Sequence, residues 1–371
     1  MTVPSAAPAG YVALLGRKAI VLGGIAGVGV LATLGLRVAG ASEVLIFVVA
    51  AVTLAGLAGL VGEGTDQLGG RFGPGATGVL QSALGNLPEL FISLFALRAG
   101  LTVLVQTALV GSILGNSLLV LGIAFLAGGL KHGKQVFDAA PVRNIAIIIV
   151  LAVASLAIPT ISTSPGGPDQ GHAVEISVFV SVVLLVVFLA SIPFSLRGGQ
   201  GASALAHAGD EAAVWPLRLA LAVLAVGSVG AAFVSDWFVE ALRPAMATLG
   251  VSEAFVGLVV VAIAGNAVEN VVGIQQAMRN RTDLAISLIQ NSSLQVAIAL
   301  TPVLMLASLV VSPTPMTLVL APTLLVGLSL TAILGAFVVF DGESTWLEGL
   351  MLLGLYAIIA ASVWYGPPVR V

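Results

Sequence analysis

Two stretches of the chain carry the same polar residues at the same spacing in apolar surroundings. The first reads Gly-Asn-Leu-Pro-Glu over residues 85–89, and the second reads Gly-Asn-Ala-Val-Glu over residues 265–269, which is 180 residues later. A carboxylate at the centre of a bilayer costs about 2.5–3.5 kcal/mol on insertion scales, so it marks a functional site by default. Two carboxylates at matching positions, Glu89 and Glu269, therefore predict one site built by both halves of the chain.

A second polar group follows each motif, Gly-Ser-Ile-Leu-Gly-Asn over residues 111–116 and Asn-Ser-Ser-Leu-Gln over residues 291–295. All of these side chains offer oxygen, and none offers sulfur or a fixed positive charge. A hard cation such as Ca²⁺ takes about 6–8 oxygen ligands at about 2.3–2.6 Å. We therefore expect a cation to be held by the first four, and cation or protons to be bound by all, of Glu89, Glu269, Asn86, Asn266, Ser112, Asn116, Ser292, Gln295 and Asn270.

Residues that interrupt helices stand beside both glutamates. Pro88 has no N–H group and its ring clashes with the carbonyl one turn earlier, so together with Gly85 it should open the helix next to Glu89. Gly265 occupies the equivalent place before Glu269. Broken helices free backbone carbonyls for cation coordination, which a membrane tolerates only around a cavity lined by protein.

The composition is that of a polytopic membrane protein. Of 371 residues, 58% are hydrophobic and 8% are charged, whereas soluble domains carry about 25% charged residues. The absence of cysteine excludes thiolate metal sites and disulfides, and three scattered histidines disfavour a zinc site. An intramembrane hydrolase is disfavoured as well, because the chain has no Gly-x-Ser-x-Gly and no histidine within an apolar run. We expect no enzyme activity and no cofactor.

Apolar runs separated by glycine, proline and charged residues predict eleven transmembrane helices. The run after Arg17 and Lys18 is long enough to span a membrane, which favours a retained helix over a cleaved signal peptide. The predicted divisions are residues 1–40 with the first helix, 41–194, a polar cytoplasmic loop at 195–216, and 217–371. The predicted spans are 19–37, 44–61, 76–98, 101–127, 143–159, 174–194, 217–239, 253–278, 284–311, 316–340 and 346–365.

Positive charge predicts the orientation of these spans. With the N-terminus in the cytoplasm, ten lysines and arginines fall inside and four outside, and the C-terminus lies outside. Glu89 on the third span and Glu269 on the eighth are then five spans apart, so their helices cross the membrane in opposite directions. We therefore predict an all-α membrane protein with one N-terminal helix and two inverted five-helix repeats, an arrangement typical of secondary transporters.

On these motifs the chain resembles the calcium/proton exchanger family of the calcium/cation antiporter superfamily. The shared patterns are Gly-Asn-x-x-Glu in each half, Gly-Ser-x-x-x-Asn in the first and Ser-x-x-Gln in the second. The resemblance implies two inverted five-helix repeats that exchange Ca²⁺ for protons through Glu89 and Glu269. Two departures stand out: Asn270 replaces a histidine, and only Asp210 and Glu211 remain of an acidic run that binds regulatory Ca²⁺. We therefore expect altered pH tuning and claim no regulatory site.

These observations predict a secondary active antiporter that exchanges Ca²⁺ for H⁺ by alternating access. The alternatives are a Na⁺/Ca²⁺ or Na⁺/H⁺ antiporter and, from another class, a passive cation channel, since glutamates and oxygens also line pores. All further acids, Glu63 and Asp66 included, are placed at span ends or in loops, which favours protons over Na⁺. We expect inorganic cations and the lipid bilayer as partners, no nucleic acid, and a location in a prokaryotic plasma membrane; the oligomeric state stays open.

Intramembrane amides and hydroxyls outside the motifs have a simpler interpretation. Gln106, Ser117 and Ser287 are predicted to make hydrogen bonds between helices, which contribute about 0.6 kcal/mol each on average.

Overall fold

The computed structural model describes residues 11–72, 84–196 and 215–366. Within these ranges the chain is almost entirely helical, with one two-stranded antiparallel sheet that pairs Gln135 with Ser344. The segments η1, η2 and η3 are π-helical turns inside longer helices. In chain order the elements are α1 (Tyr11–Val38), α2 (Glu43–Phe72), α4 (Leu87–Arg98), α5 (Thr102–Leu114), η1 (Gly115–Val120), α6 (Leu121–His132), β1 (Gln135–Val136), α7 (Ala139–Ser162), α8 (Ala173–Leu196), α10 (Leu217–Leu249), α11 (Glu253–Phe255), η2 (Val256–Val261), α12 (Ala262–Gly265), α13 (Ala267–Met278), α14 (Thr282–Gln295), η3 (Val296–Leu300), α15 (Thr301–Val311), α16 (Pro322–Val338), β2 (Glu343–Ser344) and α17 (Trp346–Tyr365).

In the described residues, 8 helices are long and apolar enough to cross a membrane. A ninth span is formed if Glu253–Gly265 and Glu269–Met278, which meet at a bend of 66°, are taken together. Large apolar side chains such as Leu31, Val186 and Met351 are exposed on these helices, as expected of surfaces that face lipid. The predicted span 76–98 is described only from residue 84, and most of the predicted loop 195–216, with Asp210 and Glu211, lies outside the described residues.

The second helix is longer than the sequence predicted. We expected a glycine- and proline-rich connection over residues 62–75, but α2 continues to Phe72. The glycines serve packing rather than a turn: a Cβ on Gly64 would lie 3.3 Å from the backbone of Leu224 in α10. Glu63 also pairs with Lys18 of α1 at 2.7 Å. Asp66 is consequently part of a membrane helix, and its predicted place in a loop is wrong.

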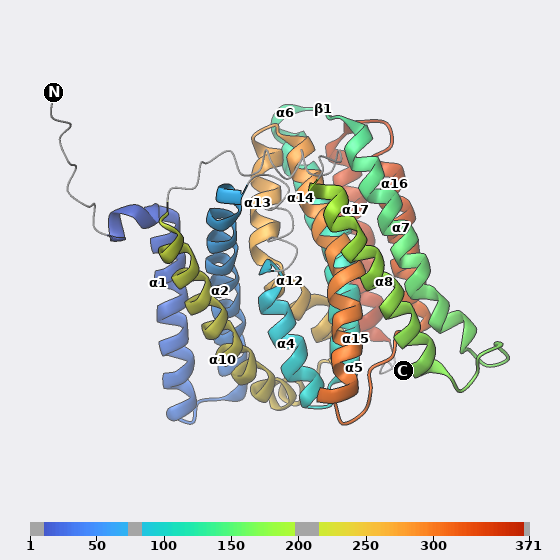
Figure 1. The fold of residues 1–371 in the computed structure, drawn as a ribbon, viewed down its shortest axis with the longest axis horizontal. Helices are drawn as coiled ribbons and strands as arrows, with labels where there is room; N and C mark the ends of the chain where they lie inside the picture. The colour runs from blue at the N-terminus through green and yellow to red at the C-terminus, as the bar shows by residue number, and fades with distance from the viewer. Residues whose placement is uncertain (1–10, 73–83, 197–214, 367–371) are drawn as a thin grey trace.

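The helices form two groups (Figure 1). α1, α2 and α10 pack against one another at one side of the molecule, and the other helices form a larger group beside them. Where the groups meet, α13 runs through the upper half of the view and α4 through the lower half. Each boundary of α13 lies 180 residues after that of α4. Both helices are followed by a residue with positive φ, Gly100 at 73° and Asn280 at 59°.

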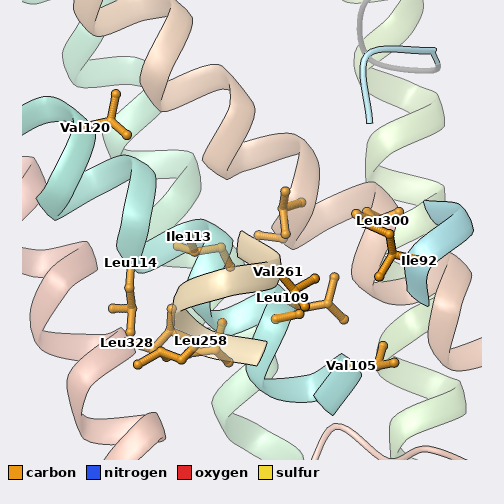
Figure 2. Close-up of a cluster of buried hydrophobic side chains, with 14 of the residues drawn as sticks. Ile92, Val105, Leu109, Ile113, Leu114, Val120, Leu258, Val261, Leu300 and Leu328 are labelled. Carbon is orange, nitrogen blue, oxygen red and sulfur yellow. The ribbon is translucent and has the colours of Figure 1, made fainter. Parts of the chain in front are cut away.

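The core is centred on the crossing of α5 and η2. Figure 2 shows buried side chains there, among them Leu109 and Ile113 of α5 and Leu258 of η2. The crossing is close because Gly111 lies on the backbone of Leu258 and Gly257 lies on that of Leu104. Small residues allow membrane helices to approach in this way. The packing fixes Ser112, the residue after Gly111, beside the second half of the chain.

Gly111→Ala is expected to destabilise the protein, because an added Cβ would lie 2.6 Å from the Cα of Leu258. Overpacking of this kind costs about 1–3 kcal/mol. The measurement is thermal unfolding in detergent, and the matched control is Gly115→Ala on the same long helix, where an added Cβ would meet nothing within 4 Å. Equal melting temperatures for the two variants would contradict the close crossing.

Residues 316–321, predicted as the start of a span, are not helical. Buried backbone without helical hydrogen bonds needs other partners. The N–H groups of Met316, Leu318 and Leu320 donate to side-chain hydroxyls on α15, α8 and α7 at 2.8–2.9 Å. Gln106 donates to the carbonyls of Thr317, at 2.7 Å, and Val319. Gln106 therefore binds two elements together, which is the structural role predicted for it.

Candidate cation-binding site

Both glutamates lie in the first turn of a helix that starts in the middle of the molecule. α4 begins directly after Asn86, and α13 begins directly after Asn266. Helix N-termini carry free N–H groups and a partial positive charge, which favours carboxylates there. Pro88 occupies the first turn of α4, where its missing N–H costs nothing. The interruptions expected at Gly85 and Gly265 therefore fall one residue later, at the two asparagines, and Pro88 starts a helix instead of bending one.

A chain of hydrogen bonds joins the two halves around Glu89. Ser112 donates to Glu89 Oε1 at 2.5 Å, and the amide of Asn266 donates to Ser112 at 3.0 Å. Ser292 donates to Asn266 Oδ1 at 3.3 Å, and the amide of Asn116 donates to Ser292 at 2.9 Å. Residues of the two motifs thus alternate along a single network. This network is the arrangement that a jointly built site requires.

Two further contacts extend the same surface between the halves. Asn86 Nδ2 donates to Gln295 Oε1 at 3.3 Å, so the first asparagine meets the last residue of the second motif. Ser117 and Ser293 share a hydrogen bond of 3.2 Å, the helix-to-helix role predicted for Ser117. Ser287 is buried, and its hydroxyl has no hydrogen-bond partner among the described residues.

The two glutamates differ in their access to the surroundings. Glu89 is fully buried, and its Oε2 has no hydrogen-bond partner in the described part of the chain. A Cβ on Gly265 would lie 3.3 Å from the Cβ of Glu89, so Gly265 leaves room for that side chain. Glu269 instead lines a cavity of about 90 Å³, large enough for several waters. The other lining residues are Gly62, Thr65, Asp66, Gly85, Val272, Leu288, Asn291, Ser292 and Gln295.

Three polar residues of this cavity were missed by the sequence reasoning: Thr65 and Asp66 of α2 and Asn291 of α14. Asp66 was set aside because glycines around it suggested a loop, although its position one turn after Gly62 on a continuing helix was a usable signal. Asn270, predicted to bind the cation, is half-buried and is not among the described cavity-lining residues. Its Oδ1 is buried without a hydrogen-bond partner among the described residues.

The donor set suits a transported cation better than a resident metal. In the described residues no group of three or more His, Cys, Asp or Glu side chains could hold a metal ion. The site combines two carboxylates with neutral amide and hydroxyl oxygens, which are the ligands of hard cations. Glu89 and Glu269 are close enough for their charges to interact. Two neighbouring carboxylates repel when both are ionised, and a bound cation or protons relieve that repulsion.

A helical membrane protein with paired glutamates at two helix breaks belongs to the class of ion transporters. The family model described as sodium/calcium exchanger protein matches residues 42–197 and 219–365, and the chain belongs to that family. It is 34% identical over 320 residues to the Ca(2+)/H(+) antiporter ChaA of Bacillus subtilis (strain 168), covering 85% of this chain and 90% of that protein. It is 32% identical over 346 residues to the Ca(2+)/H(+) antiporter of Aphanothece halophytica, covering 88% and 92%.

Solved structures agree with these relatives. The structure of native YfkE superposes with a TM-score of 0.79 at 30% identity and covers 92% of this chain and 99% of that one. The resemblance to calcium/proton exchangers, predicted from the motifs, is thereby confirmed.

Proposed function

We propose that the protein is a secondary active antiporter that exchanges Ca²⁺ for H⁺ across the membrane. The observation that carries the proposal is the hydrogen-bonded chain from Glu89 through Ser112 to Asn266, which places the motifs of both halves around one carboxylate. The names of the relatives that match most of the chain, two Ca(2+)/H(+) antiporters, support Ca²⁺ and protons as the exchanged ions.

The mechanism is competition for the same two side chains. In one state Glu89 and Glu269 are ionised and hold a dehydrated cation together with Asn86, Asn266 and neighbouring oxygens. In the other state both are protonated and cross without a cation. Because one pair of carboxylates cannot hold both loads, movement of Ca²⁺ in one direction requires protons in the other. Two protons neutralise the charge that one Ca²⁺ neutralises.

Alternating access is proposed to come from two inverted repeats that follow the first helix, within eleven spans. The opposite courses of α4 and α13, with boundaries 180 residues apart, support the inversion. So does the family model, which matches one segment in each half. Inverted repeats related about the membrane plane allow the same site to open to either side by exchanging conformations between them.

The proposed orientation places the end of the molecule that carries β1 and β2 in the cytoplasm. Lys131, Lys134, Arg279 and Arg281 lie at that end. Single cysteines at Asp341, beside β2, and at Thr314, after α15, should react with impermeant thiol reagents from the inside and from the outside respectively. The chain's lack of cysteine gives a clean background. Reaction of both positions from one side would contradict the orientation and the odd number of crossings.

Asn270→His is expected to shift the pH dependence of transport. The substitution restores the histidine of related exchangers, a side chain that titrates near pH 6.5. Transport rates are measured from about pH 5.5 to 8.5 for the wild type and the variant, with Asn270→Gln as the uncharged control. An active variant with an unchanged pH profile would place Asn270 outside the coupling path.

The function is tested in proteoliposomes with defined ion gradients. A pH gradient without Na⁺ should drive Ca²⁺ to accumulate on the acidic side, and an ionophore that dissipates the pH gradient should stop the accumulation. Ca²⁺ uptake driven by a Na⁺ gradient at equal pH, and not by a pH gradient, would favour a Na⁺/Ca²⁺ antiporter. Downhill leakage that neither gradient can drive uphill would favour a channel.

A further inference from the structure

The cavity beside Glu269 reaches from the helix breaks toward one end of the molecule only. Its lining residues come from the C-terminal part of α2, from α13 after its first turn, and from α14 before its last residue. All three segments lie between the middle of the molecule and the end that carries β1 (Figure 1). In the proposed orientation this is the cytoplasmic side. A cation that enters from the cytoplasm therefore meets these residues before it meets the glutamates.

Asp66 is the exposed carboxylate of that path. It lies on α2, its side chain is exposed, and it lines the same cavity as Glu269. The two residues are close enough for their charges to interact. Yet no three acidic or histidine side chains in the described residues are grouped tightly enough to hold one metal ion. Asp66 therefore lies near the binding site without belonging to the set that coordinates the cation.

The other half of the chain has no matching carboxylate. The residue 180 positions after Asp66 is Met246 of α10, which lies near the opposite end of the molecule. The paired glutamates, asparagines and serines of the site all have counterparts at this spacing, but Asp66 does not. The duplication is thus asymmetric at one acidic position, and the asymmetry distinguishes one entrance of the pathway from the other.

We propose that Asp66 is a positioning residue that attracts the divalent cation into the cytoplasmic cavity and delivers it to Glu269. The inference deepens the proposed function and rests on it. A cleft that carries one sign of charge between low-dielectric walls raises the local concentration of the opposite ion and its rate of entry about 10–10³-fold. With no counterpart of Asp66 on the outer side, the protein loads Ca²⁺ more readily from the cytoplasm than from outside.

The test compares Ca²⁺ transport from each side of the membrane. Inverted and right-side-out membrane vesicles are prepared from a host that lacks its own calcium exchangers. Asp66→Asn should raise the KM for Ca²⁺ on the cytoplasmic side about tenfold, the lower limit for such charged clefts, with little change in the maximal rate. The KM on the outer side should stay at the wild-type value, and Asp66→Glu should restore the cytoplasmic KM.

Ionic strength provides a readout that a structural role would not change. Salt screens charges with a Debye length of about 10 Å at 0.1 M. The cytoplasmic KM of the wild type should therefore rise with ionic strength, and that of Asp66→Asn should rise less. Asp341→Asn is the matched control, because Asp341 is an exposed aspartate near the same end of the molecule and does not line the cavity. Its KM and salt dependence should equal those of the wild type.

Equilibrium binding of ⁴⁵Ca²⁺ to the purified proteins in detergent separates this inference from the proposed function, because binding needs no gradient. Weaker binding by Asp66→Asn supports the capture role even if the wild type fails to accumulate Ca²⁺ against a gradient, a result that would overturn the antiporter proposal alone. Active exchange by Asp66→Asn with wild-type binding and wild-type KM on both sides would overturn the capture role alone. An equal rise of KM on both sides would overturn it too.

Discussion

Glu89→Gln is expected to abolish exchange and leave the protein folded. Glutamine keeps the shape of the side chain and can still accept the hydrogen bond from Ser112, but it has neither the negative charge nor the titration of glutamate. Loss even of a group that only supports a metal ligand costs about 10–100-fold in metal affinity or activity. We expect the loss of a ligand itself to exceed about 100-fold in the rate of Ca²⁺ accumulation in proteoliposomes.

The matched control for this variant is Ser93→Ala. Ser93 is also buried on α4, and its hydroxyl has no hydrogen-bond partner in the described part of the chain. Its removal should leave most of the transport rate. Wild-type transport by Glu89→Gln, with Ser93→Ala behaving alike, would show that the buried carboxylate is not part of the exchange mechanism.

Glu269→Gln is expected to remove Ca²⁺ binding as well as exchange. Glu269 is the glutamate that lines the cavity, so its carboxylate is the one that a cation reaches first on the way to Glu89. A ligand at 100 times its dissociation constant stabilises the folded protein by about 2.7 kcal/mol. The wild type should therefore melt at a higher temperature when Ca²⁺ is added, whereas Glu269→Gln should show no such shift.

Without Ca²⁺ the same variant should be at least as stable as the wild type, since a carboxylate in membrane surroundings is costly to keep. Glu43→Gln, at the exposed start of α2, serves as the control and should keep the Ca²⁺-dependent shift. A full Ca²⁺-dependent shift in Glu269→Gln would assign the cation to other ligands.

Much of the membrane architecture follows from the apolar runs, because a spanning helix must satisfy its backbone internally and be apolar along its length. The exceptions have physical causes. α2 extends through several glycines because α10 packs against them. Residues 316–321 are apolar enough for a span, but their N–H groups find hydroxyls on other helices instead of helical partners. Contacts supplied by other helices cannot be read from a local pattern.

The site divides in the same way. Equal spacing in two motifs was enough to predict that Asn86, Glu89 and Ser112 would meet the second half of the chain. It could not predict which partner each side chain has, such as Ser112 with Asn266 or Asn86 with Gln295, because those pairs depend on how α5 crosses η2 and α14. Nor could it predict the unequal access to Glu89 and Glu269, because a duplicated sequence adopts only one of its two conformations at a time.

Proton release on Ca²⁺ binding tests most directly whether the same two carboxylates carry both ions. Carboxylate ligands must be deprotonated to bind a metal ion, so binding releases the protons that they carried. Addition of Ca²⁺ to the purified protein in weakly buffered detergent solution should release up to two protons for each Ca²⁺ bound at acidic pH, and progressively fewer as the pH rises. The Glu89→Gln and Glu269→Gln variants should release none. Ca²⁺ binding by the wild type without proton release at any pH would contradict the shared-site mechanism.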